Sequence, residues 1–125
     1  MKLRDKVAIV TGASQGIGKG IAIGLAEAGA DVVVNYYKNA AGAEAVKNEI
    51  LKIGRKCLSL QGDVSVRKDV ARLTQTTLSE FGKIDILVNN AGILIPGALI
   101  DLAEEKWDRV VQVNLKGVFL CSQAV

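Results

Sequence analysis

The sequence predicts an α/β fold in which a parallel β-sheet is covered by helices on both faces. Short apolar runs, each suited to a buried strand, recur at residues 7–10, 32–34, 57–60 and 84–88. Successive runs start 25, 25 and 27 residues apart, which leaves room for a crossover helix and two short loops. Runs that are apolar on both faces are typical of a parallel sheet covered on both sides. We therefore expect a doubly wound α/β domain.

The segments after these runs have the apolar spacing of helices. The spaced residues are Ile17, Ile21, Leu25 and Ala28; Val46, Ile50 and Ile53; Val66, Val70, Leu73 and Phe81; and Trp107, Val110 and Val111. Gly54 and Gly82 are expected to end the second and third helices, because glycine readily adopts the left-handed conformation found there. Ser65 is expected to cap the start of the third helix, and Asp101 with Glu104 has the capping-box spacing that opens a fourth.

The final segment, residues 115–125, is apolar on nearly all sides and has no C-terminal cap. A helix of this kind is expected to be buried or to lie at an interface.

The composition is that of one compact globular domain over residues 1–125. Half of the 125 residues are hydrophobic, 23% are charged and only one is proline, which excludes a disordered chain. The net charge of +3 suits small anionic ligands, but no charged run of the kind that binds nucleic acid is present. No apolar stretch is long enough for a membrane span and no secretory signal is visible. We expect a cytoplasmic protein that binds neither nucleic acid nor membrane.

The cysteine and histidine content argues against metal or catalytic-triad chemistry. Cys57 and Cys121 are isolated in the sequence, and there is no histidine. Neither a zinc site nor a Ser-His triad can be assembled from these residues. No metal site is expected.

Residues 11–18, TGASQGIG, are a glycine-rich turn between the first apolar run and the first helical segment. A strand that ends in such a turn directs free backbone N–H groups and the positive end of a helix dipole to one point, where a phosphate binds. Gly12, Gly16 and Gly18 have the spacing G-x-x-x-G-x-G rather than the usual G-x-G-x-x-G. This pattern favours a Rossmann-type dinucleotide-binding domain; the alternative is that the glycines only close a turn.

Three further motifs follow in order: Asp63-Val64, then Asn89 to Gly92, then Asn114 to Gly117. With the glycine-rich turn, they make residues 6–125 resemble the classical short-chain dehydrogenase/reductase family. The resemblance implies an oxidoreductase that transfers hydride between a nicotinamide dinucleotide and a small carbonyl or alcohol substrate.

The resemblance implies a role for each motif in holding the coenzyme. The residues expected to line the pyrophosphate and the adenosine ribose are Gly12, Ser14, Gly16, Ile17 and Gly18. Asp63 and Val64 are expected to flank the adenine, with the carboxylate accepting from its amino group; alternatively, Asp63 only starts a helix.

The Asn-Asn-Ala-Gly motif is expected to serve the nicotinamide end. Asn90, Ala91 and Gly92 would bring backbone close to the nicotinamide ribose, while Asn89 and Thr11 would join the fourth strand to the first. A simple strand-terminating turn is the alternative for Asn90 and Gly92.

Asn114 matches the asparagine of the family's catalytic tetrad, although it could instead only kink a helix. The family's serine and Tyr-x-x-x-Lys are absent, since Tyr36 and Tyr37 are followed four residues later by Ala40 and Ala41. We expect the chain to be the N-terminal half of such an enzyme, truncated after about four strands and inactive alone. The fourth run would then be an open sheet edge, which favours a homo-oligomer.

The end of the second run bears on the choice of coenzyme. Tyr36 stands where a carboxylate normally selects NAD, so a 2′-phosphate is tolerated and Lys38 can pair with it. Gln15 argues the other way, because NADP-preferring relatives often carry a basic residue there. The sequence therefore favours NADP, with NAD as the alternative coenzyme. A non-catalytic nucleotide-binding or redox-sensing module remains the alternative function.

Overall fold

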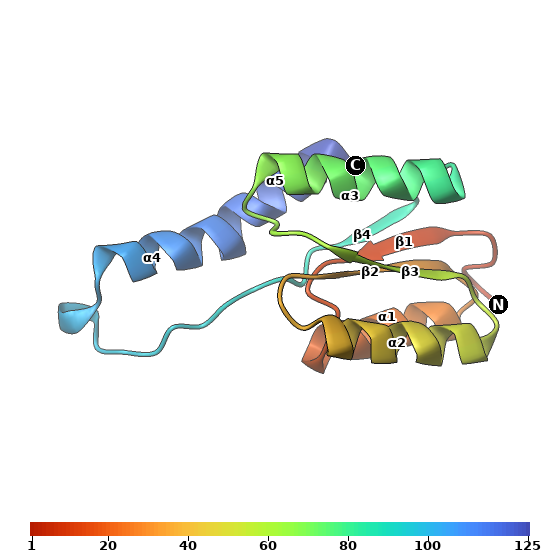
Figure 1. Ribbon diagram of the computed structural model, residues 1–125, viewed down its shortest axis with the longest axis horizontal. Helices are drawn as coiled ribbons and strands as arrows, with labels where there is room; N and C mark the ends of the chain where they lie inside the picture. Colours follow the sequence, from red (N-terminus) through yellow and green to blue (C-terminus); the bar gives the residue numbers. More distant parts are fainter.

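The computed structural model describes residues 1–125, and its centre is a four-stranded parallel sheet (Figure 1). The strands are β1 (Val7–Val10), β2 (Asp31–Tyr36), β3 (Cys57–Gln61) and β4 (Ile86–Val88). Their order is β3-β2-β1-β4, with Ile9 opposite Val33 on one side and Leu87 on the other. The predicted fold class is confirmed.

Helices cover both faces of the sheet, as expected for apolar strands of a parallel sheet. α1 (Gly16–Glu27) and α2 (Ala40–Ile53) lie on one face, and α3 (Arg67–Phe81) and α5 (Gly117–Ala124) on the other (Figure 1). Alternate strand residues serve the two layers: Val32 and Val34 pack toward α1 and α2, whereas Ile9 and Val33 pack on Leu73 of α3. None of the helices combines the length and the apolar character that a membrane span requires.

From Glu104 to Ala124 the chain is one helical run of changing type. A 3₁₀ turn η1 (Leu99–Asp101) precedes α4 (Glu104–Val111), a π turn η2 (Gln112–Lys116) and α5. Figure 1 shows α4 projecting from the body of the molecule, while α5 lies beside α3. The inner side of this run packs on Val64 and Val70 through Val113, Leu120 and Cys121. Other residues of this run, Leu115 and Phe119 among them, are exposed.

The two glycine stops are confirmed, but two helix starts were wrong. Gly54 and Gly82 end α2 and α3 in the left-handed conformation, with φ of +96° and +81°. Ser65 does not cap α3, which begins after Val66; its N–H and hydroxyl instead donate to Asp63. Asp101 lies in η1, and α4 begins after Ala103 without a side-chain cap.

Some predicted boundaries and faces also differ from the structure. β4 begins at Ile86 rather than at residue 84, because the carboxylate of Asp85 accepts the N–H of Val7 at 2.8 Å. Val66 and Trp107, predicted on buried helix faces, are 41% and 55% exposed. β4 has a neighbour only on its β1 side, as expected for an edge strand.

Candidate functional site

A cavity of about 410 Å³ opens at the carboxyl ends of the strands. This is where open parallel sheets bind ligands, at the point where successive connections run to opposite sides. The loops after β1, β2, β3 and β4 line it, together with two residues of the C-terminal helical run, Arg109 and Val113. The cavity therefore gathers the glycine-rich turn, Asp63-Val64 and the segment Asn90 to Gly92, which sequence analysis found separately, but not the motif that begins at Asn114.

The glycine-rich turn forms the floor of the cavity because its glycines let the chain come close to the segment after β4. Gly12 and Gly16 have φ of +60° and +59°. A Cβ on Gly12 would lie 2.8 Å from the Cα of Ala91, and one on Gly18 would collide with the Gly12 carbonyl and the Asn90 amide. The first turn of α1 contains no acidic residue and no side-chain cap, so its amides can receive an anion.

Thr11 and Asn90 join the exits of β1 and β4. The Thr11 hydroxyl oxygen accepts from the N–H groups of Asn90 and Ala91, both at 3.0 Å. The Asn90 amide donates to the carbonyls of Thr11 and Gly12 at 3.2 and 3.0 Å. Asn89 was expected in this junction and is not part of it, since it donates to Ser122 of α5 instead.

Asn35, which sequence analysis did not single out, supports the turn from beneath. It is 2% exposed, and its side-chain oxygen accepts from the N–H of Gly12 at 3.2 Å. Its amide donates to the carbonyls of Leu60 and Gly62. One polar residue in the otherwise apolar run VVVNY was the signal that could have revealed it.

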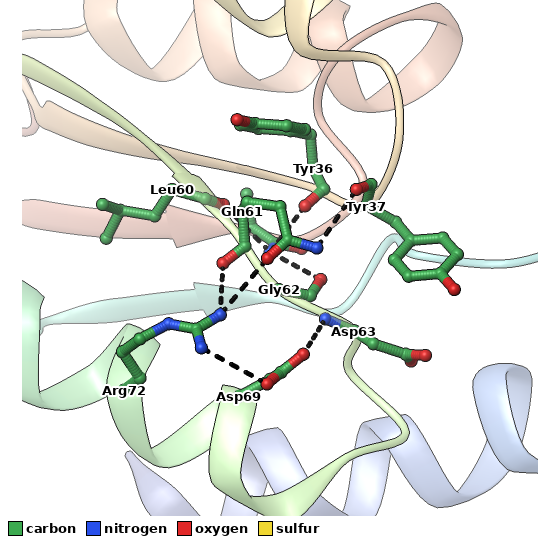
Figure 2. A network of polar contacts seen from close by, with 9 residues as sticks. Tyr36, Tyr37, Leu60, Gln61, Gly62, Asp63, Asp69 and Arg72 are labelled. Carbon is green, nitrogen blue, oxygen red and sulfur yellow. Dashed lines mark hydrogen bonds and ion pairs between the residues drawn. The ribbon is translucent and has the colours of Figure 1, made fainter.

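At the end of β2, Tyr37 lines the cavity and Tyr36 does not. Tyr36 packs on the core under α1 and α2, because alternate residues of a strand face opposite sides and Tyr36 follows the side of Val34. Figure 2 shows the two rings pointing in different directions. The expected placement of Tyr36 in the site was therefore wrong by one residue. Lys38 lines the cavity, with its ammonium 5.3 Å from the centre of the Tyr37 ring.

Asp63 is held by an ion pair that sequence analysis missed. Its Oδ2 accepts from Arg109 of α4 at 2.9 Å, and its Oδ1 accepts from the N–H and the hydroxyl of Ser65. Arg109 also donates to the Ser65 hydroxyl at 2.8 Å and lies 5.5 Å from the centre of the Tyr37 ring. Partial burial raises the pKa of Asp63, but the hydrogen bonds from Ser65 and Arg109 outweigh it and hold that pKa below its usual value.

The remaining expected residues divide between the cavity and its surroundings. Those that line it are Gly12, Ser14, Gly16, Lys38, Asp63, Val64, Asn90, Ala91 and Gly92. Gly18 is buried beneath the turn, and Ile17 is 79% exposed and outside the lining. Gln15 and Asn39 line it too and are joined by a 2.9 Å hydrogen bond.

Asn114 lies in the π turn η2, and its side chain pairs with the backbone of Ile93. Its oxygen accepts the Ile93 N–H at 2.8 Å and its amide donates to the Ile93 carbonyl at 2.9 Å. These two hydrogen bonds to the backbone of Ile93 hold the segment after Gly92 against the helix. Asn114 itself does not line the cavity.

A family model described as short chain dehydrogenase matches residues 6–125. The chain belongs to the short-chain dehydrogenase family. It is 46% identical over 123 residues to a 3-oxoacyl-[acyl-carrier-protein] reductase of Synechocystis sp., covering 98% of this chain and 50% of that protein. The reductase FabG of Staphylococcus epidermidis is also 46% identical, over 97% of this chain and 50% of its own length. The chain thus spans about half the length of the curated relatives it matches.

Solved short-chain dehydrogenases share the fold. One from Burkholderia cenocepacia, in complex with NADP, is 42% identical with a TM-score of 0.96, over 99% of this chain and 51% of that one. One from Serratia marcescens is 39% identical with a TM-score of 0.95, again over 99% and 51%.

The ion pair of Asp63 predicts how the stability of the chain depends on pH. A carboxylate whose pKa is lower in the folded state stabilises the fold at pH values above its unfolded pKa of about 3.9. That stabilisation is lost as the pH falls through the folded value. Arg109→Met should therefore lower the free energy of unfolding by about 1 kcal/mol near neutral pH, and the loss should shrink below pH of about 4.

Urea denaturation at a series of pH values measures this difference. Lys106→Met removes an exposed cation from the same helix and is the matched control, expected to change little. A penalty for Arg109→Met that stays constant down to pH of about 3 would show that Asp63 is not its electrostatic partner.

Proposed function

We propose that this chain is the coenzyme-binding part of an oxidoreductase that transfers hydride between NADP and a small carbonyl or alcohol substrate. The observation that carries the proposal is the cavity at the carboxyl ends of the strands, with the glycine-rich turn and the first turn of α1 on its floor. Free amides at a helix start favour the pyrophosphate of a dinucleotide. The bound nicotinamide would supply or accept the hydride.

The roles proposed for the coenzyme-binding residues are those that the family resemblance implies, and the places of these residues in the cavity support them. Gly12, Ser14 and Gly16 would hold the pyrophosphate, with Gly18 packing the turn from below and Ile17 at its exposed rim. Asp63 and Val64 would flank the adenine. Asn90, Ala91 and Gly92 would lie against the nicotinamide ribose.

The charges at the end of β2 favour NADP over NAD. Asp63 is the one carboxylate that lines the cavity, and Arg109 already pairs with it. Lys38, together with the side-chain amides of Gln15 and Asn39, would face a 2′-phosphate without a competing negative charge. The relative from Burkholderia cenocepacia was solved with NADP, which supports the same choice.

Asn114 would position the nicotinamide end. Its double hydrogen bond to Ile93 holds the segment that follows Gly92 in place. Relatives named as 3-oxoacyl-[acyl-carrier-protein] reductases support a ketone as the substrate to be reduced.

Gly18→Ala tests coenzyme binding. A methyl group there collides with the Gly12 carbonyl and Asn90, whereas Gly20, two residues along the same helix, has open space around it. Titration of NADPH, followed by its fluorescence, should show binding by the parent and by Gly20→Ala, and at least about ten-fold weaker binding by Gly18→Ala. Equal affinity of the two variants would remove the glycine-rich turn from the proposed site.

The 125-residue chain alone should not catalyse the reduction of a ketone by NADPH. Tyr36 is packed in the core and Tyr37 lies at the end of β2, so neither offers an acid-base group beside Gly92 and Asn114. The absorbance of NADPH should stay constant with a panel of 3-oxoacyl thioesters. Sustained oxidation of NADPH would contradict this prediction. Failure of the chain to bind any nucleotide would contradict the proposed coenzyme-binding function itself.

We also propose that copies of the chain associate. Leu94, Leu99 and Ile100 are 83 to 91% exposed and follow the open edge strand β4. Sedimentation velocity should reveal dimers or larger species, and Leu99→Lys combined with Ile100→Lys should shift the population toward monomer. A parent chain that sediments as monomer at high concentration would refute the association.

A further inference from the structure

Three polar side chains that do not line the cavity contact the backbone of two residues that do, Tyr37 and Asp63. Gln61 ends β3, and Asp69 and Arg72 belong to the first two turns of α3. Figure 2 shows them between the strand ends and α3, joined by a chain of polar contacts. We call these three residues the brace.

One arm of the brace ends on the loop after β2. Arg72 donates through Nη2 to the Gln61 carbonyl at 2.8 Å and to Gln61 Oε1 at 3.3 Å. Because Oε1 faces the guanidinium, the amide nitrogen of Gln61 must face the other way. It donates to the carbonyl of Tyr37 at 3.2 Å, which fixes the backbone directly before Lys38.

The other arm ends on the loop after β3. Asp69 Oδ2 accepts the backbone N–H of Asp63 at 2.8 Å, and its Oδ1 accepts from Arg72 at 3.4 Å. Arg72 thus joins the two arms. Beside them, the buried Asn35 donates to the carbonyl of Gly62, so both loops are fixed through side chains rather than through strand pairing alone.

We propose that the brace positions the two loops of the adenosine end and that its Gln61 arm sets the preference for a 2′-phosphate. This inference rests on the proposed function, which assigns the 2′-phosphate to the loop of Tyr37 and Lys38 and the adenine to Asp63. The brace residues are positioning residues, because none of them lines the cavity.

The two arms predict different binding signatures. The Gln61 arm holds only the loop that meets the 2′-phosphate, so its loss should weaken NADPH more than NADH. The Asp69 arm holds the loop that meets the adenine, which both coenzymes share, so its loss should weaken both equally. Arg72 is 55% exposed and its ion pair with Asp69 is long, so little folding stability depends on it.

The test is the dissociation constant of the purified protein for NADPH and for NADH. Gln61→Met keeps the length of the side chain and adds no charge, and it should reduce the NADPH over NADH preference about five-fold, the effect of one lost hydrogen bond. Arg72→Lys keeps the positive charge but cannot bridge two oxygens and one carboxylate, and it should change the ratio in the same direction. Asp69→Ala should weaken both coenzymes about five-fold with the ratio unchanged.

Lys68→Ala, an exposed residue on the same helix, is the matched control and should change neither constant. Circular dichroism checks the fold of each variant, and Arg72→Lys decides the question if Gln61→Met does not fold. A ratio that stays unchanged in Gln61→Met and Arg72→Lys, with parent binding intact, overturns the brace and leaves the proposed function standing. A parent that binds neither coenzyme overturns both.

Discussion

The glycine-rich turn after β1 lies directly against the segment that follows β4, and the rest of the cavity is placed relative to this contact. Gly12 meets Ala91 so closely that no side chain fits between them, and Gly18 meets Asn90 in the same way. Thr11 and Asn90 then exchange hydrogen bonds across the junction. The glycine-rich turn is therefore fixed against the exit of β4 by close backbone contact and by these side-chain hydrogen bonds, and the first turn of α1 begins directly beside this junction.

The local charge in the cavity is decided by the ion pair of Asp63 and Arg109 rather than by the net charge of the chain. Its single carboxylate, Asp63, is matched by Arg109, which reaches it from a helix 46 residues further along the chain. No other carboxylate lines the cavity beside the start of α1, Lys38 and the side-chain amides of Gln15 and Asn39. The same pairing joins the loop after β3 to α4, which continues into the π turn that holds Asn114 against Ile93.

Patterns of short range were readable from the sequence, and most contacts between distant residues were not. The contact of Thr11 with the segment after the fourth strand, which the family resemblance implied, is the exception. The apolar runs predicted four parallel strands, and Gly54 and Gly82 predicted two helix ends, because each depends on local backbone conformation. Ser65 failed as a cap because its hydroxyl oxygen accepts from Arg109 while its hydroxyl proton is donated to Asp63. Tyr36 was placed on the wrong side because one residue decides which face of a strand a side chain takes. The buried amide of Asn35 and the brace depend on neighbours that spacing does not reveal.

The π turn at residues 112–116 carries one more consequence. A helix that contains such a turn winds more slowly there, so the faces of α4 and α5 are rotated relative to a uniform α-helix. Winding the same five residues as a regular α-helix, at about 100° per residue, would instead advance α5 by roughly a quarter turn. Leu120 and Cys121 would then leave the core beside Val70, while Arg109 stayed at Asp63. The π turn thus sets the rotation of α5 relative to α4, and the backbone winding of this stretch is constrained even at positions where the side chain is exposed.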